Sequence, residues 1–83
     1  MKLAKYTKFR EEKFGAVLFE TRSEKVFTLN PSAAAVVREI GAGADERRII
    51  ERLKTRFRDG DGLIEREAVA FIAELRQKGL VED

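Results

Sequence analysis

The sequence predicts an α+β fold in which a three-stranded antiparallel sheet is followed by three helices. Strand-forming residues are concentrated in the first third of the chain, between Lys8 and Leu29. Apolar residues at helical spacing follow in three segments, each with a capping or terminating signal. Because no proline- or glycine-rich linker separates the two parts, residues 1–83 are expected to form a single domain.

Composition limits the class of protein. Of 83 residues, 43% are hydrophobic and 39% are charged, which is typical of a folded domain with a heavily charged surface. A core of this size leaves no room for a buried cofactor. The net charge is only +2 and the two signs are interleaved along the chain, which argues against a nucleic-acid-binding face.

The residue types needed for common catalytic and metal sites are missing. The sequence contains neither histidine nor cysteine, so zinc sites and the usual nucleophilic triads are excluded. We therefore expect no enzymatic activity, no metal and no cofactor. There is also no apolar run long enough for a signal peptide or a membrane span, so we expect a cytoplasmic protein.

The β-rich third is expected to form a meander. Residues 1–7 are basic and lack a period, so they are expected to be a flexible or loosely attached arm. Lys8–Lys13 is a polar candidate for the first strand, and Phe14–Thr21 is a continuous apolar run of the kind found in central strands. After a tight polar connection at Arg22–Glu24, Lys25–Leu29 returns antiparallel.

A sharp strand-to-helix junction follows at Asn30-Pro31-Ser32. Asn30 suits an N-cap because its side-chain oxygen can accept a backbone N–H of the first turn, and Pro31 has its φ already set for a helix. The helix is expected over Ser32–Ile40, with small residues on one face that allow close packing on a sheet.

Two more helices are expected after Gly41–Ala44 breaks the periodicity. Asp45 can cap a helix that runs to about Phe57; its many basic residues are interpreted as a solvated face, with a phosphate-contacting helix as the alternative. The third helix spans Ile64–Lys78. Gly79 followed by Leu80 predicts a Schellman cap, and Val81–Asp83 adds a short extended piece.

The connection Arg58–Leu63 (RDGDGL) has the acidic residues of a calcium loop but not its spacing. Counted from Asp59, an EF-hand needs glycine at the sixth position and glutamate at the twelfth, which here are Ile64 and Ala70. We interpret the segment as a polar connection between helices.

The strand Lys25–Leu29 is expected at an edge of the meander. Exposed edges carry unpaired N–H and C=O groups, which natural proteins often guard with lysine, and Lys25 can serve that purpose. The alternative is a docking edge, to which an extended peptide adds as a further strand.

Three stretches of the sequence resemble PqqD-like proteins, small domains also called RiPP recognition elements. They are REEKFGA at Arg10–Ala16 with its following apolar strand, LNPSAAAVVREI at Leu29–Ile40, and FIAELRQKGLVED at Phe71–Asp83. The resemblance spans about Phe9 to Glu82. Asp45 stands where the family usually has threonine or serine as a helix cap.

The resemblance implies a winged helix-turn-helix-like fold that binds the leader segment of a ribosomally made precursor peptide. In the family the leader adds as a strand to the third strand, beside the third helix. Carried over by position, the peptide-binding residues are Lys25, Val26, Phe27, Thr28 and Leu29 on the strand and Val69, Ile72, Ala73 and Arg76 on the helix. Arg76 is then a candidate partner for an acidic leader residue.

The resemblance also implies a peptide chaperone that presents the leader to a separate enzyme. That enzyme would be a radical SAM maturase or another peptide-modifying enzyme, and any iron–sulfur cofactor would belong to it. Monomer and homodimer both remain open. Two alternatives are a DNA-binding winged helix, for which the third helix has as many acidic as basic residues, and an oligomerisation module whose edge strand is already paired.

Overall fold

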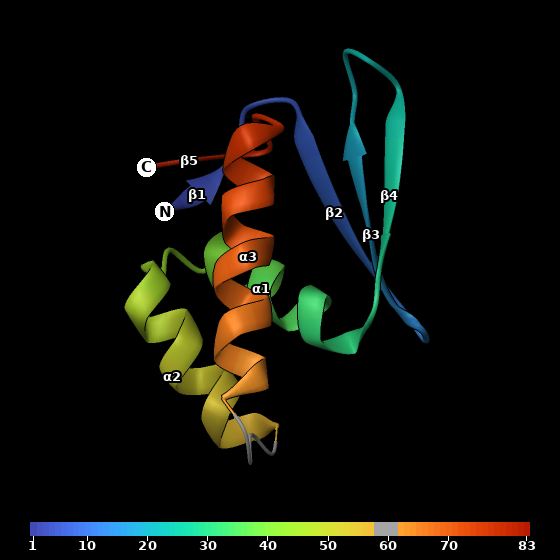
Figure 1. Ribbon diagram of the computed structural model, residues 1–83. Coiled ribbons are helices and arrows are strands. Elements are labelled where there is room, and N and C mark those ends of the chain that lie inside the picture. Colours follow the sequence, from blue (N-terminus) through green and yellow to red (C-terminus); the bar gives the residue numbers. More distant parts are fainter. Residues whose placement is uncertain (58–61) are drawn as a thin grey trace.

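The computed structural model describes residues 1–57 and 62–83, and it confirms the predicted α+β architecture (Figure 1). The elements in chain order are β1 (Lys2–Leu3), β2 (Thr7–Glu12), β3 (Gly15–Glu20), β4 (Lys25–Leu29), α1 (Pro31–Gly41), α2 (Glu46–Arg56), α3 (Leu63–Gln77) and β5 (Val81–Glu82). The polar connection predicted at 58–63, with its rejected calcium spacing, lies outside the described residues except for Gly62 and Leu63.

The predicted meander is confirmed as an antiparallel sheet in the order β2-β3-β4. β3 is the central strand, and its Ala16 and Leu18 are fully buried against the helices. The four-residue connection between β3 and β4 has Glu24 in the left-handed region, with φ 61°. β4 occupies one margin of the sheet (Figure 1).

The expectation of a loosely attached arm at residues 1–7 is wrong. Lys2 and Leu3 form β1, which pairs antiparallel with β5 in the register Lys2↔Glu82 and Leu3↔Val81. Met1 and Leu3 also pack against the hydrophobic core, and Thr7 is buried in β2. The segment is fixed by a strand partner from the other end of the chain, which local sequence patterns do not reveal.

The junction between β4 and α1 forms as predicted. The Asn30 side-chain oxygen accepts the backbone N–H of Ala33 at 2.9 Å, and Pro31 is the first helical residue. Ala34 and Ala35 are buried with the valines that follow them. Because these side chains are small, the α1 backbone can approach the sheet closely.

Caps also define the ends of the later helices. Asp45 accepts the backbone N–H of Arg48 at 2.9 Å and starts α2 as predicted. At the end of α3, Gly79 has φ 72°, and the Leu80 N–H donates to the carbonyl of Leu75 at 2.9 Å. This geometry confirms the predicted Schellman cap and buries Leu80 in the core.

Each helix contributes one face to a common core beneath the sheet. Ile40 of α1, Ile49 of α2 and Ile72 of α3 are completely buried in it. No helix in residues 1–57 or 62–83 is long and apolar enough to cross a membrane.

Candidate functional site

The backbone of β4 is the first component of the candidate site, and its hydrogen-bonding directions follow from the neighbouring strands. Thr21 donates its backbone N–H to the carbonyl of Tyr6 at 2.9 Å. These two residues form the pair next to Thr7↔Glu20, where the β2–β3 register begins. In an antiparallel ladder every second pair of opposite residues is hydrogen-bonded. Phe19 is two residues before Thr21, so it also directs its backbone N–H and C=O toward β2. Leu18, the next residue, therefore directs its own toward β4.

The register between β3 and β4 carries this alternation to the edge of the sheet. Leu18 lies opposite Phe27, so the N–H and C=O of Phe27 bond back to β3. The backbone N–H and C=O groups of Val26 and Thr28 point the other way, out from the open edge of the sheet. Within the described part of the chain, no strand pairs with β4 on that side.

The side chains of β4 alternate between two surfaces. Phe27 is partly buried and Leu29 is buried, and both contact the core. Val26 and Thr28 point to the opposite face of the sheet, where Val26 is 56% exposed. A strand added beside β4 would alternate in the same way, with every second side chain directed toward the helices.

A shallow groove separates β4 from α3 and forms the second component of the site. It includes a hollow of about 30 Å³. Its lining is mainly apolar, with Glu74 and Lys78 at the side of the helix; the lining residues are Leu18, Phe27, Leu29, Phe71, Glu74, Leu75, Lys78 and Leu80. Lys78 reaches across from α3, and its Nζ lies 5.6 Å from the centroid of the Phe27 ring.

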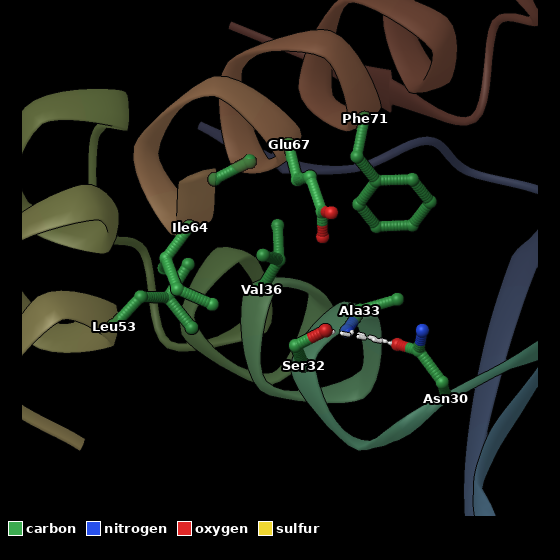
Figure 2. Close-up of a pocket in the computed structure, with 9 residues that line it drawn as sticks. Asn30, Ser32, Ala33, Val36, Leu53, Ile64, Glu67 and Phe71 are labelled. Atoms are coloured by element: carbon green, nitrogen blue, oxygen red, sulfur yellow. Dashed lines mark hydrogen bonds between the residues drawn. The ribbon is translucent and has the colours of Figure 1, made fainter. Parts of the chain in front are cut away.

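At the end of β4 nearest the Asn30 cap lies a second pocket of about 150 Å³, which shares Phe71 with the groove (Figure 2). The pocket is lined by Asn30, Ser32, Ala33, Val36, Leu53, Ile64, Glu67, Ala68 and Phe71. Figure 2 shows the Glu67 carboxylate entering the space between Val36 and Phe71. Among the residues that the structure describes, Glu67 is the one charged side chain of the lining.

At the other end of β4, charged side chains surround a third hollow. Its lining includes Glu20, Arg22, Lys25 and Lys78. Glu20 accepts the backbone N–H of Ser23 at 2.6 Å and the Ser23 hydroxyl at 2.5 Å. Both bonds lower the pKa of the Glu20 carboxyl from its usual value, and the bond from the Ser23 hydroxyl has the larger effect.

The structure brings together the five strand residues expected from the sequence but not the expected helix residues. Ile72 is completely buried in the core, Val69 and Ala73 are exposed, and none of the three lines the groove. Arg76 lies 3.7 Å from Glu46 of α2 and so faces away from β4.

Sequence reasoning missed the side chains of α3 and of its C-cap that line the groove and the adjoining pocket; they are Glu67, Phe71, Glu74 and Lys78. The core-facing stripe of a helix has one flank on each side. Val69 and Arg76 lie on the flank toward α2, whereas Glu74 and Lys78 lie on the flank toward β4. The spacing 67, 71, 74, 78 was visible in the sequence, but choosing between the flanks requires the orientation of the helix.

The described residues contain no group of three or more acidic side chains placed to hold a metal ion. What the site offers instead is an open strand edge, apolar hollows and charges of opposite sign at its two ends. These features suit a ligand that has an extended backbone and alternating side chains.

A three-stranded antiparallel sheet with three helices packed beneath it defines a winged-helix-like α+β domain. Within this class, the family model described as "Coenzyme PQQ synthesis protein D (PqqD)" matches residues 15–81. The chain therefore belongs to the PqqD family. No curated protein sequence matches it.

Two solved structures share the fold over nearly their whole length. "TbiB1 in Complex with the TbiA(beta) Leader Peptide" is 18% identical with a TM-score of 0.86, and the match covers 99% of this chain and 95% of that one. "Lasso peptide synthetase B1 complexed with the leader peptide" is 22% identical with a TM-score of 0.82, covering 99% and 96%. At these identities the similarity establishes the fold.

Proposed function

We propose that this protein binds the leader segment of a ribosomally made precursor peptide by strand addition to β4. The observation that carries the proposal is the outward direction of the Val26 and Thr28 backbone groups beside an apolar groove. Membership of the PqqD family supports it, as does the presence of a leader peptide in both similar structures.

The energetics of strand addition explain why the groove is needed as well as the edge. Val26 and Thr28 each offer one N–H and one C=O, and each backbone hydrogen bond contributes about 1 kcal/mol net. All of them together correspond to a dissociation constant of about 1 mM, which is weak binding. Side chains of the guest must therefore contribute through the apolar hollows, and these contacts also provide selectivity.

The protein acts in this proposal as a chaperone without catalytic activity of its own. It presents the bound leader to a separate peptide-modifying enzyme, a radical SAM maturase or another maturase, in the cytoplasm. The protein binds as a monomer or a homodimer. The strand residues are Lys25–Leu29, as the resemblance implied, and we replace the expected helix residues by those that line the groove, Phe71, Glu74 and Lys78.

An NMR titration of labelled protein with the leader of a precursor peptide encoded near its gene tests this function. We expect amide shifts concentrated at 25–29 and along Phe71–Lys78. Absence of peptide-induced shifts, together with salt-sensitive shifts on adding duplex DNA, would favour a DNA-binding winged helix instead. Protection of the β4 amides in a stable free homo-oligomer would favour an oligomerisation module.

A further inference from the structure

The groove presents three successive environments to a strand added at β4. In a paired strand, residues that lie opposite each other point to the same face of the sheet. Guest residues opposite Lys25, Phe27 and Leu29 therefore point toward the helices, while those between them point away. The inward positions are spaced by two residues and extend over roughly 13 Å.

The inward position opposite Lys25 lies in a positively charged environment. Arg22 pairs with Glu20 at 3.5 Å, which leaves Lys25 and Lys78 as the remaining cations around the hollow. Lys78 has a long contact of 3.8 Å with Glu74, and both side chains are well exposed. Lys25 has no ion-pair partner among residues 1–57 and 62–83. An acidic guest side chain suits this end.

Leu29 is followed directly by Asn30, which lines the pocket that contains Glu67, so the inward position opposite Leu29 is the one nearest to that pocket. Among the described residues, the one charge in the lining is the exposed carboxylate of Glu67, which lies beside the apolar side chains of Val36 and Phe71 (Figure 2). None of the described residues forms an ion pair with Glu67. A lysine or arginine suits this environment, because its aliphatic stem can cover the apolar lining while its cationic head reaches the carboxylate.

The middle position, opposite Phe27, faces an apolar environment. Phe27, Leu75 and Leu80 contribute to its lining, together with Phe71. A branched aliphatic or aromatic guest side chain would bury apolar area here. The position separates the cationic end from the anionic end.

We propose that the two ends of the groove read the charge order of the leader. The preferred peptide carries an acidic residue, an apolar residue and a basic residue at alternate positions, with the acidic residue at Lys25 and Lys78 and the basic residue at Glu67. This inference rests on the proposed function and adds the specificity of the same site. It also makes the direction of the bound peptide measurable, since only one direction places both charges correctly.

Two synthetic peptides of identical composition test the proposal. One contains Lys-Ser-Leu-Ser-Asp and the other Asp-Ser-Leu-Ser-Lys, each within the same flanking serines and threonines and with blocked ends. We expect one order to bind about tenfold more tightly at low salt, from two partly exposed charge contacts, and the difference to shrink at high salt. The tighter peptide reports the direction of the guest.

A charge-swapped variant tests whether Lys25 and Glu67 cause the preference for one peptide over the other. Lys25→Glu combined with Glu67→Lys should reverse the preferred order, because the Glu67 position becomes cationic while Glu at position 25 offsets the charge of Lys78 at the other end. The matched control, Arg47→Glu with Glu51→Lys, exchanges the charges of an exposed ion pair on α2 and should keep the original preference. Circular dichroism checks that both variants are folded.

The outcomes separate this inference from the proposed function. If both peptides shift the Val26 and Thr28 amides with equal affinity, or if the charge swap does not reverse the preference, charge reading is wrong while strand addition stands. If neither of these peptides nor the natural leader shifts these amides, the proposed function itself is wrong.

Discussion

Gly15 and Leu29 meet backbone to backbone where the sheet passes into α1. A Cβ on Gly15 would lie 2.0 Å from the carbonyl oxygen of Leu29, and φ of Gly15 is +150°, which side chains rarely tolerate. The first residue of β3 is thus held directly against the last residue of β4. This contact requires glycine for steric and conformational reasons together.

Gly15→Ala is expected to destabilise the fold severely. The added methyl group meets backbone atoms, which cannot move aside without displacing the β4–α1 junction, so we expect a loss of at least about 2 kcal/mol in the free energy of unfolding. Urea denaturation measures it. Gly41→Ala is the matched control, because a Cβ there meets nothing within 4 Å, and stability should stay equal or rise. Equal stability of wild type and Gly15→Ala would contradict the geometry described.

Prolines on β4 should distinguish its two backbone directions. Val26→Pro and Thr28→Pro each remove an N–H that points to the open edge, so leader affinity should fall about tenfold or more while the sheet persists. Phe27→Pro removes an N–H bonded to β3 and should lower stability instead. Isothermal titration and thermal melts provide the two measurements. Retained affinity in a folded Val26→Pro variant would argue against strand addition.

Two substitutions on α3 distinguish its flanks. Phe71→Ala removes a ring from the lining of the groove and should weaken leader binding by about tenfold or more. Val69→Ala removes an exposed side chain on the flank toward α2 and should change the affinity by less than about twofold. Fluorescence anisotropy with a labelled leader measures both. The reverse ranking would return the binding surface to the flank expected from sequence.

The bonds between Ser23 and Glu20 predict a pH dependence of stability. Because they lower the pKa of Glu20 in the folded state, their contribution is present above the unfolded-state pKa and is lost as pH falls through the lower folded-state pKa. Ser23→Ala should therefore lower stability at pH 7 and differ less from wild type on the acid side. Denaturation of both proteins between pH 2 and pH 7 tests this sign. A difference that grows on acidification would contradict it.

Signals that act over a few residues were predictable from the sequence. The Asn30 cap and the Schellman cap at Gly79 depend on bonds between near neighbours, so both are visible as short motifs. The position of β4 was likewise correct to the residue, since a polar turn and a helix cap delimit it.

Features that depend on distant partners were not predictable in the same way. Residues 1–7 lack a local pattern, and β1 exists because Lys2 and Leu3 pair with the other end of the chain. The facing side of α3 depends on how the helix rotates against β4. Charged residues such as Glu74 also resembled an ordinary solvated surface, and apolar Val69 was the more obvious candidate for a binding wall.

The pairing of β1 with β5 has a consequence for protein engineering. It holds residues 2 and 82 side by side, with Lys2 and Glu82 in an ion pair of 3.4 Å, on the side of the molecule away from β4 in Figure 1. A short bridge could therefore join the two ends into a closed ring, or the whole domain could be spliced into a surface loop of a host protein. Either arrangement would leave the mouth of the groove unobstructed for an incoming chain.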